Sequence, residues 1–143
     1  MSAANEVREA SARFYKALSR MAEGEKGTMA GVWSQDSDST TMHPIGGREE
    51  GWDAVSGSFD GVASAAQGGR VQLEEQRIHV AGDVAWESGI ERGHIVLAGE
   101  QVDVDGRVTN IYRRGKDGWK LVHHHADTSP AMMDVVRKLQ GGD

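Results

Sequence analysis

A chain of 143 residues is long enough to bury one substantial core and too short for two ordinary domains, so we expect a single domain over 1–143. Hydrophobic residues make up 38% of the chain and charged residues 27%, which is typical of a water-soluble globular protein. The net charge of −6, without a basic run, argues against nucleic acid binding, and the lack of cysteine excludes disulfides, thiolate zinc sites and cysteine nucleophiles.

The start of the chain does not look like a targeting segment. It carries Glu6 and Glu9 and lacks the apolar run of a signal peptide. No apolar stretch approaches the ~20 residues that a membrane span needs. We therefore expect a cytoplasmic protein without a membrane partner.

Helical periodicity dominates the first half of the chain. One apolar stripe, spaced by three and four residues, predicts a first helix that ends at Gly24 and buries Val7, Ala10, Phe14, Leu18 and Met21. A short second helix is expected after Thr28, with Met29, Val32 and Trp33 buried.

A short strand and a third helix follow. Thr40–Met42 is β-prone and ends at His43-Pro44, and Gly46-Gly47 breaks the chain. The third helix is expected from about Glu49 to Ala66, with Trp52, Val55, Phe59 and Val62 on its inner side and Gly68-Gly69 at its end.

Long strands joined by tight turns are predicted from Val71 to Asp127. Apolar residues change parity between Leu73 and Ile78, which predicts a bulge near Glu75-Gln76. Gly89 and Gly93 favour bending of the next strand. A final helix is expected after Ser129-Pro130, with Met132, Val136 and Leu139 facing inward. The order predicts an α+β fold in which helices pack on a curved antiparallel sheet around a pocket.

The register of the last hairpin decides which side chains meet. A three-residue loop at Lys116–Gly118 would place Ile111 opposite His123 and Thr109 opposite His125. One sheet face would then carry Arg107, Thr109, His123, His125 and Asp127, and the other Val104, Val108, Asn110, Tyr112, Val122 and His124. A four-residue loop would exchange the two sets of side chains between the faces in one of the two strands. Because both faces are partly apolar, we expect a homodimer through the sheet.

Several segments spread across nearly the whole chain form an ordered set: Phe14–Leu18, Val32–Ser34, His43–Gly46, Gly51–Val55, Arg107–Thr109, Arg113-Arg114 and Gly118–His125. In their order and spacing these segments resemble the SnoaL-like branch of the NTF2-like superfamily. The resemblance implies a cone-shaped barrel, usually dimeric, with a pocket between sheet and helices. Its members include ketosteroid isomerase, polyketide cyclases, dehydratases and non-catalytic adaptors, so it implies no single reaction. The tyrosine–aspartate pair of the isomerase has no obvious match here.

We expect the face that carries His123, His125 and Asp127 to turn toward the pocket, where it would form a candidate active site. His125 would be a general base oriented by Asp127, with His123 beside it and Arg107 and Thr109 stabilising an oxyanion. The alternative is purely structural: hydrogen-bonded histidines beside a simple Arg107–Asp127 ion pair. A zinc site would need His43 or Asp127 beside the His-x-His pair and lacks a third ligand at diagnostic spacing, so we predict neither metal nor cofactor.

Large apolar residues near the expected mouth are candidate ligand-binding residues, although each also suits an ordinary core. They are Trp33, Met42, Trp52 and Trp86, with His43 and the Tyr15 hydroxyl as polar neighbours. The leading hypothesis is a lyase or isomerase acting on an apolar or polyketide-like small molecule. The alternative is a non-catalytic ligand-binding or dimerisation module.

Overall fold

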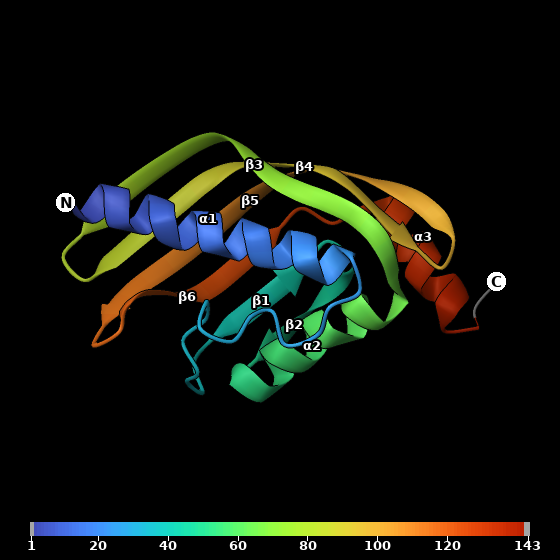
Figure 1. Ribbon diagram of the computed structural model, residues 1–143, viewed down its shortest axis with the longest axis horizontal. Helices are drawn as coiled ribbons and strands as arrows, with labels where there is room; N and C mark the ends of the chain where they lie inside the picture. Colours follow the sequence, from blue (N-terminus) through green and yellow to red (C-terminus); the bar gives the residue numbers. More distant parts are fainter. Residues whose placement is uncertain (1, 142–143) are drawn as a thin grey trace.

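In the computed structural model, residues 2–141 are described, and they form three helices and six strands (Figure 1). In chain order these are α1 (Ala3–Ala22), β1 (Thr40–His43), β2 (Gly46–Glu50), α2 (Trp52–Ala65), β3 (Ala66–Ala81), β4 (Val84–Leu97), β5 (Glu100–Gly115), β6 (Gly118–Ala126) and α3 (Pro130–Leu139). The long strands curve over α1, and α2 lies below the β1–β2 end of the sheet. The expected α+β fold is confirmed.

The strands form a single sheet in the order β2-β1-β6-β5-β4-β3. All neighbours run antiparallel except β1 and β6, which are parallel, so the wholly antiparallel prediction is wrong at this pair. No short turn joins β1 to β6, so chain connection does not impose a direction there. The break expected at Gly46-Gly47 is instead the start of β2, where both glycines have positive φ.

Two helix predictions need correction. Residues 28–32 form turns instead of a second helix because Gly31 has φ 82°, although Met29 and Trp33 are buried as expected. Helix α2 begins at Trp52 and not near Glu49, because residues 46–50 pair with β1. Gly68-Gly69 does not end that helix and lies within β3.

Bending of β3 and β4 gives the sheet its curve. The predicted bulge is confirmed: the register shifts between Glu74 and Arg77, and Glu75 has φ 55°. Gly93 has φ 148°, and a Cβ there would lie 1.9 Å from the Arg70 carbonyl oxygen. Only glycine permits the two strands to approach this closely.

The last hairpin has the expected register beyond Val122, although its loop differs from the predicted one. Gly115 pairs with Gly118 and Arg113 with Lys120, so the loop has two residues, and the prediction of three is wrong. A bulge at Val122 then restores Ile111 opposite His123 and Thr109 opposite His125. The two possible bulge positions give the same alternation beyond Val122.

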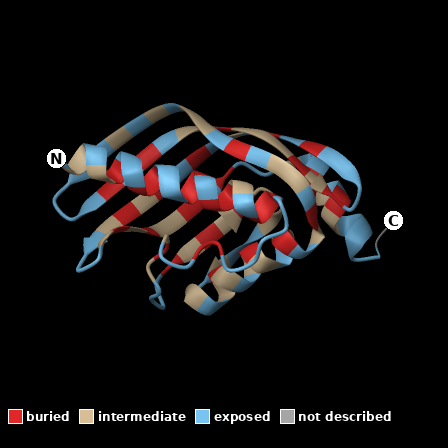
Figure 2. Ribbon diagram, viewed as in Figure 1, coloured by how far each residue is buried: buried red, intermediate tan, exposed pale blue. Residues whose placement is uncertain are grey.

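The inner sheet face, which α1 covers, carries the core. Buried and exposed residues alternate along the central strands, and buried residues recur at helical spacing along α1 (Figure 2). Phe14, Trp33, Tyr112 and Leu121 are among the largest fully buried side chains. In α3, Ser129 caps the N-terminus as predicted. Met132 and Val135 are buried, whereas Val136 and Leu139 are more exposed and border the hollow between the sheet and the helices.

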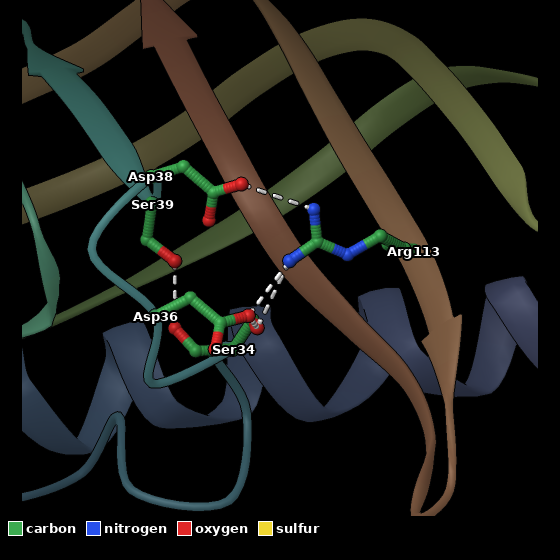
Figure 3. Close-up of polar contacts among 5 residues, drawn as sticks. All are labelled: Ser34, Asp36, Asp38, Ser39 and Arg113. Atoms are coloured by element: carbon green, nitrogen blue, oxygen red, sulfur yellow. Dashed lines mark hydrogen bonds and ion pairs between the residues drawn. The ribbon is translucent and has the colours of Figure 1, made fainter.

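Arg113 fixes the irregular segment that leads into β1 (Figure 3). Its guanidinium donates to Asp36 at 2.7 Å and to Asp38 at 3.3 Å, and it approaches the Ser34 hydroxyl. The Ser39 hydroxyl donates to the Ser34 carbonyl at 2.6 Å. These contacts tie residues 34–39 to β5 and thereby position β1, whose last residue reaches the candidate site.

Candidate functional site

A cavity of about 420 Å³ lies between the inner sheet face and all three helices. Its wall is mainly apolar and includes Leu18, Phe59, Val62, Ile95, Val104 and Met132. The polar groups on it are His43, Ser58, Glu91 and His124, with Glu49 and Gln140. An apolar cavity with a few convergent polar groups is the usual form of a small-molecule site.

Glu91 is the buried acid of this cavity. It points inward from β4, is 4% exposed, and accepts a hydrogen bond from the Tyr15 hydroxyl at 2.9 Å. Burial raises the pKa of the Glu91 carboxyl to about 7, the hydrogen bond from Tyr15 opposes that rise, and the nearby Glu87 charge adds to it. Glu91 therefore exchanges its proton near neutral pH.

A second buried carboxylate, Glu87, organises the hydrogen bonds behind Glu91. It accepts from Asn110 Nδ2 at 2.9 Å, from the Tyr112 hydroxyl at 2.9 Å and from Gln76 Nε2 at 2.6 Å. Asn110 Nδ2 also donates to the Tyr15 hydroxyl at 3.0 Å. The two carboxylates are thus linked through Asn110 and Tyr15.

Two buried histidines complete the polar part of the wall. Nδ1 of His124 lies 2.6 Å from Asn110 Oδ1, and its Nε2 lies 3.9 Å from the Glu91 carboxylate. His43 Nε2 lies 2.8 Å from Ser58 Oγ, and the ring packs edge-on against Phe59. Burial lowers the pKa of His43 to about 4 and that of His124 well below its usual value, so both rings are neutral at pH 7.

The predicted catalytic residues lie on the other side of the sheet. Thr109 and His125 are exposed, and Arg107 forms an exposed ion pair with Asp127 at 2.8 Å. These four border an open outer groove of about 530 Å³ with Glu75 and Ser88, and none of them lines the cavity. His123 is also on this face, with Nδ1 2.6 Å from the Thr40 hydroxyl. The expectation that this face encloses the hollow is wrong, because α1 covers the face that carries Asn110, Tyr112 and His124.

The predicted ligand-binding residues are also divided. His43 lines the cavity, and Tyr15 lies behind its wall in contact with Glu91. Trp33 belongs to the solid core, and Trp52 is half-buried at the start of α2. Met42 alternates with the inward-facing Thr41 and His43, so it faces outward; Trp86 is 43% exposed and stacks on His79.

A family model for the SnoaL-like domain matches residues 7–132. The chain belongs to the SnoaL-like family. Solved structures of NTF2-like proteins share the fold of this SnoaL-like domain, and no curated protein sequence matches the chain significantly. Within residues 2–141, no helix of this SnoaL-like domain is long and apolar enough to cross a membrane, and no three acidic or histidine side chains are grouped to hold a metal ion.

Three solved structures illustrate the likeness. A Streptomyces avermitilis protein of the NTF2-like family, provisionally assigned as a dehydratase, is 26% identical over 90% of this chain and 96% of its own, with a TM-score of 0.78. An NTF2-like superfamily protein from Salmonella enterica serovar Typhimurium is 19% identical over 88% and 90%, with a TM-score of 0.78. A provisionally assigned calcium/calmodulin-dependent protein kinase type II association domain from Thiobacillus denitrificans is 26% identical over 85% and 94%, with a TM-score of 0.70.

Glu87, Glu91 and Asn110 were not predicted as site residues of this SnoaL-like domain. A usable signal was present: Glu87 and Glu91 share their strand parity with Ala85, Ile95 and Leu97, which are apolar and buried. A carboxylate on the buried parity of a strand is costly unless it is paired or functional. The predicted register puts Asn110 on the same face as Tyr112 and His124, which is the inner face, but the sequence did not predict a role for it.

Proposed function

We propose that this domain binds a small, largely apolar molecule in the inner cavity and that Glu91 transfers a proton to or from it, in a reaction of the lyase or isomerase kind. The observation that carries the proposal is a carboxyl group, 4% exposed and with a pKa raised to about 7, on the wall of an apolar cavity. A group that is part protonated at neutral pH can both accept and return a proton.

One such group is sufficient for either reaction class. In an isomerisation, the Glu91 carboxylate takes a proton from one carbon and the carboxylic acid returns it to another. In an elimination of water, the proton taken from carbon leaves with the hydroxyl group of the substrate. The similarity to a protein provisionally assigned as a dehydratase supports the lyase form.

The test is hydrogen exchange at carbon. A panel of apolar cyclic ketones and β-hydroxy ketones, incubated with the protein in D₂O, is followed by proton NMR for loss of carbon-bound hydrogen and for elimination. We expect Glu91→Gln to lower the rate on any compound that the wild type turns over by about 10²–10⁴-fold. Glu100→Gln, at the exposed start of β5, is the matched control and should keep the wild-type rate.

A Glu91→Gln variant with undiminished turnover would contradict the proposed role. An alternative function is a non-catalytic ligand-binding or dimerisation module, which the similarity to an association domain favours. Saturable binding of panel members without exchange or elimination in the wild type would support that alternative.

We also propose a homodimer through the outer sheet face. Val84 and Trp86 are exposed there, beside half-buried Ile90 and Ile111. Trp86 and Ile111 are neighbours across β4 and β5, so these side chains form one apolar area next to the groove of His125 and Arg107. Apolar area of this kind is typical of an interaction surface.

A further inference from the structure

We infer that the ligand of the inner cavity is an uncharged molecule whose polar end is a hydroxyl group, and that this hydroxyl donates its hydrogen to Nε2 of His124. The inference rests on the proposed function in that it concerns the same cavity, and it names the chemical class that the cavity recognises. It follows from the direction of each hydrogen bond around the two buried histidines.

Glu87 determines the orientation of the Asn110 side-chain amide. A carboxylate only accepts hydrogen bonds, so the Asn110 atom 2.9 Å from Glu87 Oε1 is the NH₂ nitrogen. The opposite orientation would set the amide oxygen against a fully buried carboxylate, with no hydrogen between two acceptors. The Asn110 carbonyl oxygen therefore faces His124.

Asn110 in turn determines the tautomer of His124. A carbonyl oxygen accepts, so His124 Nδ1, 2.6 Å away, carries the hydrogen. The ring is neutral, and a neutral imidazole has one hydrogen, which leaves Nε2 with a free lone pair. His124 lines the cavity, and the Glu91 carboxylate at 3.9 Å is beyond hydrogen-bond distance from Nε2.

His43 is also a hydrogen-bond acceptor, and the contacts that show this are independent of those around His124. The Ser58 hydroxyl donates its single hydrogen to the Val55 carbonyl at 2.7 Å, so its oxygen must accept from His43 Nε2 at 2.8 Å. The neutral His43 ring then has its free lone pair on Nδ1. Both imidazoles on the cavity wall are therefore hydrogen-bond acceptors.

The charges on the wall exclude an anionic ligand. Among the described residues that line the cavity there is no lysine or arginine, and the two ionisable carboxyls are Glu49 and Glu91. A carboxylate or phosphate would meet two lone pairs and no cation, and would be desolvated without compensation. A hydroxyl group can donate to His124 Nε2 and accept from protonated Glu91, so it satisfies both neighbours.

The first test reads the tautomer without a ligand. Long-range ¹⁵N–¹H NMR of the ¹⁵N-labelled full chain at pH 7.5 distinguishes a protonated from a bare imidazole nitrogen. We expect Nδ1–H with a bare Nε2 for His124, assigned by its disappearance in His124→Gln. A hydrogen on Nε2 would overturn the inference.

The second test uses three probes of one shape: 2-naphthol, 2-methoxynaphthalene and 2-naphthoate, titrated by calorimetry at pH 7. We expect 2-naphthol to bind at least tenfold more tightly than either of the others, and Val62→Trp, which fills the cavity, to abolish binding. In His124→Phe the preference for naphthol over the ether should disappear, whereas His94→Phe, on the outer face of the same protein, should retain it.

The outcomes separate this inference from the proposed function. Equal affinity of naphthol and its ether in a cavity that Val62→Trp still blocks would overturn the hydroxyl inference and leave the ligand cavity intact. If His124→Phe does not fold, the affinities of the wild type for the three probes and the tautomer of His124 still test the hydroxyl inference. Unchanged turnover in Glu91→Gln would overturn the proposed reaction while leaving the probe preference valid.

Discussion

At the scale of single residues, the site depends on an ionisable carboxyl group, Glu91, that is buried where its charged form is unfavourable. Glu91 is almost wholly buried, and within residues 2–141 no lysine or arginine on the cavity wall compensates its charge. Tyr15 supplies one hydrogen bond, which limits the rise of the pKa without reversing it. Such a group costs stability when ionised, and that cost is measurable through its pH dependence.

Glu91→Gln should become stabilising relative to the wild type as the pH rises. The pKa of the carboxyl is ordinarily 4.5 and is about 7 in the folded state, so between these values the folded protein binds more protons than the unfolded chain. The wild-type free energy of unfolding therefore loses a contribution of about 3 kcal/mol from Glu91 as the pH rises through this window. Urea unfolding of both proteins from pH 5 to pH 8 measures the difference.

The difference between the two proteins is needed because His43 acts in the opposite direction. Its pKa is lowered to about 4, so its contribution to stability increases as the pH rises from about 4 to 6.5 and partly masks that of Glu91. The His43 contribution is shared by wild type and Glu91→Gln and cancels in the comparison. A pH-independent difference would show that Glu91 titrates normally and would remove the basis of its proposed role.

At the scale of elements, the cavity exists because β3 and β4 bend sharply. Gly93 adopts a positive φ and lies against the Arg70 carbonyl, where any Cβ would collide with backbone. The bulge at Glu75 adds a second bend in β3. Bulges and glycines of this kind are how antiparallel sheets acquire curvature.

Gly93→Ala should destabilise the domain by about 1–3 kcal/mol, because it combines backbone strain with a clash that only strand movement relieves. Gly57→Ala is the matched control: Gly57 is on α2, its Cβ would meet nothing within 4 Å, and the change should stabilise by about 0.5–1 kcal/mol. Denaturant unfolding at pH 7 measures both. Equal stability of Gly93→Ala and wild type would show that the close approach of the strands is not required.

At the scale of the whole molecule, the sheet has two chemically different faces. The inner face packs on α1 and borders the cavity, while the outer face presents Trp86, Val84 and the groove around Arg107 and His125. In the described part of the chain, no helix contributes a residue to the lining of that groove. A second copy of the chain would cover it, as proposed above.

Trp86→Arg should shift the protein from dimer to monomer, measured by size-exclusion chromatography with multi-angle light scattering across a dilution series. The substitution places a charge in the centre of the proposed interface, where it would be desolvated without a partner. Leu139→Arg is the control, because Leu139 is equally an exposed apolar side chain but lies on α3. A wild type that is monomeric at all concentrations would contradict the dimer.

The sequence by itself determined the features that depend on neighbours along the chain: helix α1 from its apolar stripe, the Glu75 bulge from a parity change, and the alternation that sets His123 and His125 apart from His124. Only the tertiary structure decided which of the two alternating sets is enclosed. Alternation along a strand divides its side chains between two faces but does not say which face is buried. The face on which α1 packs becomes the buried one. That choice moved the candidate chemistry from His125 to Glu91 and His124, which the helix and the cavity enclose.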